Sequence, residues 1–237
     1  MRSLQFYSYV VSYEEDLGIS GIDFSSDFIK AVKKRFGHVE SVCDFGSGNG
    51  FIGLSLLANG LCNHVTLLDK NPLAIKVCKD TVRRNQLGKN VSVCRSDVFK
   101  NVRKSEQWDI IIGNPPHHIG TNQQHLSDMK SYDPEWKVHQ ELYNTAGEHL
   151  KIGGSLLLIE DIRDSKPAQW KRLIEETNDL IFIKAFRPRI IRLPNTKRLD
   201  YLKMVSNKNN SSMIASGLEW ILNPIAPYYI IWSKKQY

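Results

Sequence analysis

Asn114, Pro115, Pro116 and His117 directly follow an apolar run and form the most informative segment of the chain. Neither proline has a backbone N–H, and each fixes φ near about −65°, so this turn is stiff. The first proline also excludes the helical region for Asn114, which stays extended. The Asn114 side-chain oxygen and a neighbouring carbonyl are then two hydrogen-bond acceptors in a rigid frame. Such a frame suits the two hydrogens of an NH₂ group while its nitrogen acts as a nucleophile.

A second segment, 44–53, joins a short buried strand expected over 41–45 to the start of a helix, expected over 51–58. Its glycines allow a tight turn and close approach of a ligand to the helix N-terminus. A dinucleotide fingerprint would place its third glycine where Phe51 stands. Asp44 precedes the loop, where a carboxylate repels a pyrophosphate but can hold a cationic or hydroxylated ligand. The segment therefore predicts a nucleoside site that does not take NAD.

Acidic residues follow the next two expected strands. The strand 64–68 ends on Asp69, which lies 19 residues after Gly50, the usual distance for an acid that binds ribose hydroxyls. The strand 91–94 leads to Asp97. Either acid alone also fits a helix cap or a solvated turn. Because open α/β sheets bind ligands at the carboxyl ends of their strands, the acids and the glycine loop together predict one site.

Together these motifs resemble the class I S-adenosylmethionine-dependent methyltransferases. More narrowly, they resemble the amino-methyltransferases with an Asn-Pro-Pro-aromatic motif, which modify adenine N6 or guanine N2 in nucleic acids, or glutamine side chains of release factors. The resemblance covers about residues 20 to 165, including a segment, 153–160, that is similar to the fifth strand of that fold. It implies an α/β, Rossmann-like fold: a mostly parallel seven-stranded sheet with helices on both faces and an antiparallel C-terminal strand.

The resemblance also implies roles for individual residues. Asp69 would bind the ribose hydroxyls, Asp97 the adenine amino group, and the glycine loop the methionine part of S-adenosylmethionine, with Asp44 near its ammonium. Asn114 and the carbonyl of Pro115 would orient the acceptor nitrogen. The expected cofactor-binding residues are Asp44, Gly46, Ser47, Gly48, Gly50, Asp69, Lys70, Asp97, Val98 and Asn114, and the expected catalytic residues are Asn114, Pro115, Pro116 and His117.

His117 departs from the family pattern, which has an aromatic ring at this position. Imidazole can still stack on a planar acceptor, but with less area, and it titrates near physiological pH, so it can also serve as a base. The pair His117-His118 resembles the Phe-His of guanine-N2 ribosomal RNA enzymes, which are about twice this length. No carboxylate or cysteine stands at a matching helical spacing from His117, His118 and His125, so no metal is predicted.

The chain length predicts a single domain over 1–237. We expect an N-terminal segment (1–40) that covers the cofactor or substrate, a nucleoside-binding core (41–164) and a C-terminal part (165–237). Within the last, 187–227 is expected to be a substrate lid or a decorated surface loop. The sequence lacks a long apolar run and an apolar signal segment. Its four cysteines form no Cys-x-x-Cys pair, which favours a reduced, cytoplasmic setting.

The remaining pattern predicts further elements outside the motifs. The helix after Asn71-Pro72 should run to about Gln86, with Gly88 as its stop. The strand after 187–227, over 228–233, is expected at an edge of the sheet. Other expected elements are the helices from Ser25 or Ser26 to Arg35 (with Gly37 as stop), from Asp133 to Leu150 and from Asp164 to Thr177, and the strand 180–186.

The charge of the chain bears on the methyl acceptor. The formal net charge is +7, and basic residues gather at Lys184, Arg187, Arg189, Arg192, Lys197, Arg198 and Lys203. A basic segment beside an amino-methyltransferase site favours RNA, whose affinity rests mainly on phosphate contacts. A small molecule of a biosynthetic pathway and a protein glutamine remain alternatives. A non-catalytic nucleoside-binding protein is a hypothesis of another class, and the intact Asn114 argues against it. The sequence does not indicate an oligomeric state.

Overall fold

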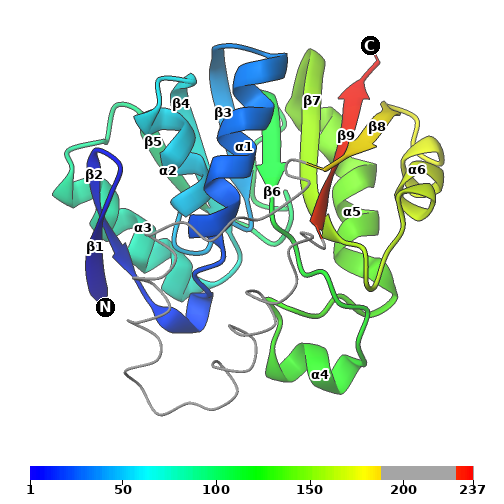
Figure 1. The fold of residues 1–237 in the computed structure, drawn as a ribbon, viewed down its shortest axis with the longest axis horizontal. Coiled ribbons are helices and arrows are strands. Elements are labelled where there is room, and N and C mark those ends of the chain that lie inside the picture. Colours follow the sequence, from blue (N-terminus) through cyan, green and yellow to red (C-terminus); the bar gives the residue numbers. More distant parts are fainter. Residues whose placement is uncertain (188–227, 237) are drawn as a thin grey trace.

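The computed structural model describes residues 1–187 and 228–236. Its centre is a seven-stranded sheet in the order β5-β4-β3-β6-β7-β9-β8, in which only β9 runs antiparallel to its neighbours (Figure 1). This is the predicted Rossmann-like α/β fold. The strands are β3 (Val39–Phe45), β4 (Cys62–Asp69), β5 (Val91–Arg95), β6 (Trp108–Gly113), β7 (Leu150–Asp161), β8 (Leu180–Phe186) and β9 (Tyr228–Lys235).

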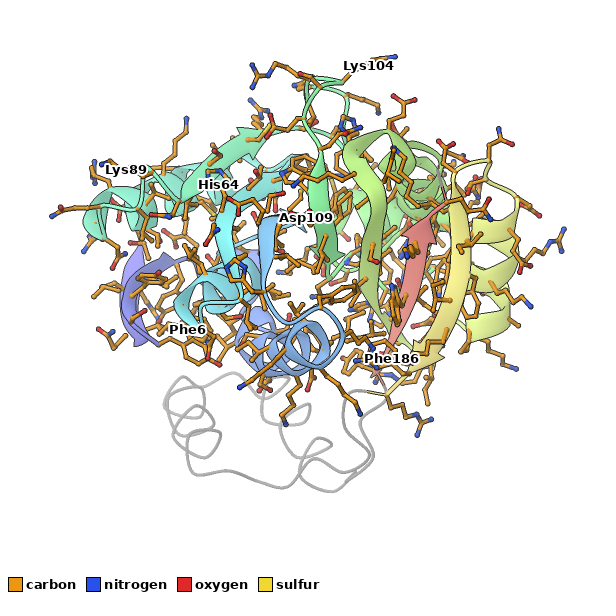
Figure 2. All side chains as sticks on the ribbon, turned by 90° about the horizontal axis from the view of Figure 1, so that it is seen from above. Phe6, His64, Lys89, Lys104, Asp109 and Phe186 are labelled. Atoms are coloured by element: carbon orange, nitrogen blue, oxygen red, sulfur yellow. The ribbon has the colours of Figure 1, made fainter. Side chains whose placement is uncertain are left out.

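Helices cover both faces of the sheet because alternate side chains of each strand point to opposite sides. On one face, Val42 and Leu67 join a buried cluster with α1 (Gly21–Arg35), α2 (Phe51–Ala58) and α3 (Pro72–Arg84). On the other, Cys43 and Leu68 join a second cluster with α5 (Lys137–Ala146) and α6 (Pro167–Glu175). Figure 2 shows side chains filling the space on both sides of the sheet.

An N-terminal hairpin was not foreseen from the sequence. Strands β1 (Arg2–Phe6) and β2 (Tyr9–Tyr13) form a separate antiparallel pair, followed by the short 3₁₀ helix η1 (Glu15–Leu17). The hairpin is fixed to α3, since the Ser12 hydroxyl donates to Asp80 (2.6 Å) and the Ser12 N–H donates to Thr81 Oγ1 (3.0 Å). These buried bonds hold the following segment, including η1, near the carboxyl ends of the strands.

Two helices end or begin away from their predicted positions. Helix α1 begins at Gly21, before Ser25, because its first turns already bury Phe24. Helix α3 ends at Arg84, and Gln86 rather than Gly88 takes the left-handed conformation (φ 56°). The end of α3 is set by packing, since Leu87 is buried and its N–H donates to the Val82 carbonyl (2.9 Å).

The predicted helix from Asp133 to Leu150 is divided. It consists of the 3₁₀ helix η2 (Pro134–Trp136), α5 and the 3₁₀ helix η3 (Gly147–His149), and Leu150 already belongs to β7. Glu135 and Trp136 both have φ of 57°, which interrupts the first part. The carboxylate of Asp133 accepts from the backbone N–H groups of Val138 and His139, so the regular helix begins after this interruption. A short helix, α4 (Asn122–Ser127), precedes this region. The helix predicted within 164–177 is α6 (Pro167–Glu175).

The predicted edge position of the last strand is wrong. β9 lies between β7 and β8 and pairs with both, so the sheet edges are β5 and β8. Tyr229, Ile230 and Ile231 are buried, because both faces of this strand are covered. β9 follows β7 and β8 in the sequence but is inserted between them in the sheet.

The structure also reports on the cysteines and on membrane-spanning segments. All four cysteines are free, and Cys78 Sγ donates to the Gly48 carbonyl (3.3 Å), which links α3 to the glycine loop. Within residues 1–187 and 228–236, no helix combines the length and the apolar character needed to cross a membrane.

Gly53 is expected to resist substitution because α2 lies very close to the sheet. A Cβ atom there would lie 2.8 Å from Val65 Cγ1 and 2.9 Å from Leu67 Cδ2. Gly53→Ala should lower the free energy of unfolding by about 1–3 kcal/mol, since overpacking outweighs the gain in helix propensity. The control is Gly88→Ala, where no atom lies within 4 Å of the added Cβ. Equal urea midpoints for the two variants would contradict this packing argument.

Candidate functional site

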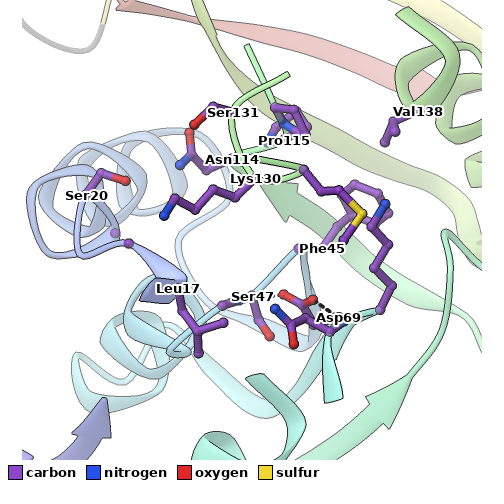
Figure 3. Close-up of a pocket in the computed structure, with 18 of the residues that line it drawn as sticks. Leu17, Ser20, Phe45, Ser47, Asp69, Asn114, Pro115, Lys130, Ser131 and Val138 are labelled. Carbon is purple, nitrogen blue, oxygen red and sulfur yellow. Dashed lines mark hydrogen bonds between the residues drawn. The ribbon is translucent and has the colours of Figure 1, made fainter. Parts of the chain in front are cut away.

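A cavity of about 580 Å³ opens at the carboxyl ends of the parallel strands. This volume is within the usual range of about 300–1,000 Å³ for small-molecule sites. Its walls come from the N-terminal segment, the glycine loop after β3, the loops after β4 and β5, the turn after β6 and the segment 127–131. Figure 3 shows Asn114 and Lys130 across this cavity from Ser47 and Asp69.

The glycine loop has the conformation that its composition predicts. Gly46, Gly48 and Gly50 have φ values of 64°, 53° and 81°, a region that favours glycine over residues with a Cβ. Asp69 fixes the loop, because its carboxylate accepts from the Gly48 N–H (2.8 Å) and from the Asn71 N–H (2.8 Å). Burial raises the pKa of Asp69, and these hydrogen bonds oppose the rise. Asp69 thus supports the loop and lines the cavity.

Asp44 is placed behind the cavity wall, and neither it nor Gly50 lines the cavity. The Asp44 side chain is only 1% exposed, and its Oδ2 accepts from the N–H of Gly53 in α2 (2.7 Å). Its Oδ1 is buried without a hydrogen-bond partner among the described residues. Burial raises the pKa of Asp44 to about 7, the bond from Gly53 opposes this, and repulsion from Asp69 adds to it.

The loop after β5 brings Asp97 and Val98 to the cavity, together with Lys70 from the loop after β4. Asp97 is exposed and pairs with Lys100 (3.1 Å). Val98 is buried and has φ of 49°, which is strained for a β-branched residue. Strain of this kind costs about 1–3 kcal/mol and gathers at functional sites.

The four residues expected to be catalytic all line this cavity. Strand β6 pairs with β3 so that Gly113 lies opposite Phe45, which puts Asn114 beside the glycine loop. Asn114 Oδ1 is buried and has no hydrogen-bond partner within the described part of the chain. An unpaired buried acceptor costs about 1–3 kcal/mol, so a ligand N–H here would restore a missing hydrogen bond. Pro115, Pro116 and His117 complete this wall.

Two groups that shape the cavity were not identified from the sequence. Asn49, in the glycine loop, donates to the carbonyls of Glu14 (3.1 Å) and Gly18 (2.7 Å) and so fixes the N-terminal segment against the cavity. Lys130 Nζ donates to the Asp16 carbonyl (2.9 Å), which joins the segment 127–131 to the N-terminal segment. Asn49 stands at a variable position of the glycine motif, and Lys130 belongs to no motif.

The three histidines after β6 have separate surroundings. His117 is 13% exposed, and its Nδ1 lies 3.9 Å from Glu160 Oε2. His118 pairs with Asp164, and His125 Nδ1 contacts a backbone carbonyl (2.5 Å). The basic residues Arg189, Arg192, Lys197, Arg198 and Lys203, and residues 188–227 of the expected lid, lie outside the described residues. Lys184 and Arg187 are exposed.

A buried polar cluster stands behind His117 and was also not foreseen. His139 Nδ1 lies 2.7 Å from Asp133 Oδ2, and His139 Nε2 lies 3.0 Å from Glu160 Oε1. All three side chains are almost fully buried. Burial alone lowers the pKa of His139, but the two carboxylates raise it to about 9. Burial alone would raise the pKa of Glu160 and of Asp133, but the charged imidazole of His139 lowers both.

The family described as methyltransferase small domain matches residues 18–181, which is more than half of the chain. The matched range contains the glycine loop, Asp69, Asp97 and the segment from Asn114 to His117.

The alignments with individual relatives cover about half of this chain. It is 29% identical over 126 residues to the release factor glutamine methyltransferase of Fusobacterium nucleatum (49% of this chain, 35% of that protein). It is 30% identical over 118 residues to the ribosomal RNA small subunit methyltransferase C of Haemophilus influenzae (50% and 31%). The chain thus covers about a third of the length of each of these relatives.

Among solved structures, the fold is similar to that of a T. thermophilus 16S rRNA methyltransferase in complex with AdoMet and guanosine. The TM-score is 0.59 at 17% sequence identity, covering 99% of this chain and 50% of that one. At this identity, the likeness concerns the fold.

His139 is expected to stabilise the fold mainly below neutral pH. Its raised pKa gives a contribution that is complete below about pH 6.5 and is lost as the pH rises through about 9. His139→Gln leaves two buried carboxylates without a cation, so it should cost about 3–5 kcal/mol near pH 6 and clearly less above pH 9. Urea unfolding at both pH values measures this, with exposed His38→Gln as control. A pH-independent loss would contradict the charged state of His139.

Proposed function

Because the chain belongs to the family of methyltransferase small domains, we propose that it is an S-adenosylmethionine-dependent N-methyltransferase. The proposed acceptor is a planar amino or amide nitrogen. The observation that carries this proposal is the unpaired Oδ1 of Asn114, held on the rigid Asn-Pro-Pro turn in the same cavity as Asp69 and the glycine loop.

The residues of the cavity fit the proposed cofactor. Asp69 is suited to ribose hydroxyls, and Asp97 with the strained Val98 to the adenine ring. The three left-handed glycines let the backbone approach the methionine part closely. The unpaired Oδ1 of Asp44 lies behind that loop, and S-adenosylmethionine carries both an ammonium and a sulfonium. A cation near this carboxylate would favour its ionised form, which burial disfavours.

The protein's task in this reaction is alignment. S-adenosylmethionine supplies a methyl group that its sulfonium already activates. Asn114 Oδ1 accepts one hydrogen of the acceptor NH₂ and the Pro115 carbonyl accepts the other, which directs the nitrogen lone pair at the methyl carbon. The proline turn holds both acceptors without competing N–H groups. The buried wall around Asn114 excludes water from the reacting atoms.

We propose RNA as the acceptor. Support comes from the ribosomal RNA methyltransferase relative, the net charge of +7, and Lys70 and Lys130 in the cavity wall. Arg187, Arg189, Arg192, Lys197 and Arg198 are the proposed phosphate contacts. The release factor glutamine methyltransferase relative favours a protein glutamine as the second candidate, since its amide presents the same NH₂ geometry.

The absence of disulfides among the four cysteines is consistent with a cytoplasmic location.

Asn114→Ala tests the proposed chemistry. We expect turnover to fall at least about a hundredfold with cofactor affinity nearly unchanged, because the hydrogen bond lost with the Asn114 side chain is the one that orients the acceptor. The assay transfers tritiated methyl from S-adenosylmethionine into a lysate of cells lacking the protein, followed by separation of RNA, protein and small molecules. Exposed Asn63→Ala is the matched control. Undiminished labelling by Asn114→Ala would remove Asn114 from the mechanism.

The labelled pool identifies the acceptor class. Label in RNA should decline steeply between 50 and 200 mM salt, by about 10³-fold or more if six or more phosphates are contacted. Label in protein would instead support a glutamine acceptor, and label among small molecules a biosynthetic substrate. Labelling absent from all three pools, with cofactor still bound, would support a non-catalytic nucleoside-binding protein.

Cofactor affinity is expected to depend on the ionisation of Asp44. Since the pKa of Asp44 is raised to about 7 and a cationic ligand favours the carboxylate, affinity should be about tenfold weaker at pH 6 than at pH 8. Asp44→Asn retains an amide oxygen for the Gly53 N–H, so it should fold, bind more weakly at pH 8 and show a flat pH dependence. Isothermal titration calorimetry measures both, with exposed Glu40→Gln as control. An unchanged pH dependence in Asp44→Asn would assign the effect to another group.

A further inference from the structure

We propose that His117 and Glu160 form a proton-accepting pair beside the acceptor nitrogen, with His139 and Asp133 positioning Glu160 from behind. This rests on the proposed methyl transfer and assigns what happens to the proton that the acceptor loses. In it His117 is the catalytic residue, and the other three act through it.

The first observation is a group of unpaired polar atoms. Both ring nitrogens of His117 and the Oε2 of Glu160 are buried and have no hydrogen-bond partner within the described part of the protein. His117 Nδ1 and Glu160 Oε2 face each other at 3.9 Å, which is too long for a hydrogen bond. Buried polar atoms are nearly always paired, so an unpaired set at a cavity wall indicates a functional use.

The second observation is the charge of the cluster. Glu160 is fully buried on β7, and its other oxygen contacts His139, which Asp133 holds from the opposite side. Two carboxylates therefore share one imidazolium, so one negative charge of this cluster remains unbalanced. The unpaired oxygen of Glu160 faces His117, so this negative charge lies close to the imidazole ring. A proton on His117 would balance it.

The other titratable groups around His117 already have partners. Asp161, the next residue of β7, is bound by Arg163. His118, from the same loop, pairs with Asp164. The remaining contacts are with rings: Tyr228 of β9, with centroids 5.7 Å apart, and Phe24 of α1, edge-on at 6.4 Å. Burial raises the pKa of the Tyr143 and Tyr229 phenols, and the nearby charge of Glu160 adds to the rise. Among these groups, Glu160 has the carboxylate oxygen that still lacks a countercharge.

The proton balance of the reaction follows from this arrangement. The acceptor nitrogen bonds to the methyl carbon while the carbon–sulfur bond breaks and its electron pair stays on sulfur. The nitrogen then carries a positive charge and one proton too many. Because Nδ1 faces Glu160, Nε2 is the ring nitrogen left to take this proton, once the methylated nitrogen has released one of its two hydrogen bonds to Asn114 and Pro115. The charge of the imidazolium formed is balanced by the Glu160 carboxylate that faces it, and after product release the ring returns the proton to water.

A phenyl or phenol ring at position 117 would stack on the acceptor but would not serve this purpose. His117→Phe therefore separates the two roles, since it restores the aromatic ring of the family and removes the ring nitrogens that accept the proton. Glu160→Gln keeps the size of the side chain and removes the charge that faces His117. Glu175→Gln on the exposed surface of α6 is the matched control.

The experiment measures single-turnover transfer of tritiated methyl at pH 5.5 to 9, with S-adenosylmethionine saturating at every pH so that the ionisation of Asp44 does not enter the rate. The probe is total RNA from cells lacking the protein, or the protein or small-molecule pool if the wild type labels that one instead. The wild-type rate should fall at acidic pH, because a base that is already protonated accepts no further proton. His117→Phe should be slower by about a hundredfold or more with a flat acidic limb, as expected on losing a general base. Glu160→Gln should be about tenfold slower, with its acidic limb moved to lower pH. Calorimetry should give wild-type cofactor affinity for both.

The outcomes distinguish this inference from the proposed function. Labelling by the wild type, together with a wild-type rate and pH profile in His117→Phe, would overturn the proton-accepting pair and leave the methyltransferase intact. An unshifted limb in Glu160→Gln would overturn the role of Glu160. If the wild type labels no pool, the proposed transfer itself fails, and the proton-accepting pair fails with it.

Discussion

The pairing of β3 with β6 is the constraint on which the site depends. These parallel strands are distant in the chain, and their register places Gly113 opposite Phe45. A Cβ at Gly113 would lie 3.0 Å from the Phe45 carbonyl, so the close approach is sterically demanding. Because both strands end at the same level, the glycine loop and the Asn-Pro-Pro turn leave the sheet side by side. The proposed methyl-donor and acceptor sites thus meet through backbone pairing, before any side chain is considered.

Around this frame, the protein leaves several buried polar groups unpaired. Asp44 Oδ1, Asn114 Oδ1 and Glu160 Oε2 all lie in or behind the cavity wall without a described partner. Each costs stability, because a buried acceptor has lost its water and gained no donor in return. The strained Val98 lies at the same cavity. The fold is therefore least satisfied where a ligand is proposed to bind, and the two closely packed clusters on the sheet faces must supply the stability to offset this.

The sequence predicted those features that depend on local patterns. Apolar runs ending in Asp69 or Asn114, and the glycines between Asp44 and Phe51, identify strand ends and a tight turn from neighbouring residues alone. The insertion of β9 between β7 and β8 was missed because strand order depends on contacts between distant segments. The same holds for Asn49, whose partners belong to the N-terminal segment, and for Asp133, His139 and Glu160. Asp133 and His139 are only six residues apart, but their partner Glu160 lies on β7, 21 residues after His139, and belongs to no motif.

The buried triad is better explained by function than by stability. A buried ion pair often contributes no more than apolar side chains of similar size, because its attraction is offset by the loss of hydration. Here two carboxylates share one imidazole, and a surplus negative charge remains in the interior, so apolar packing would serve the core at least as well. What apolar packing would not provide is a carboxylate oxygen fixed 3.9 Å from the ring of His117. A histidine in place of the aromatic ring and a charged cluster behind it are therefore two parts of one arrangement, since an imidazolium in a buried wall needs a countercharge of this kind.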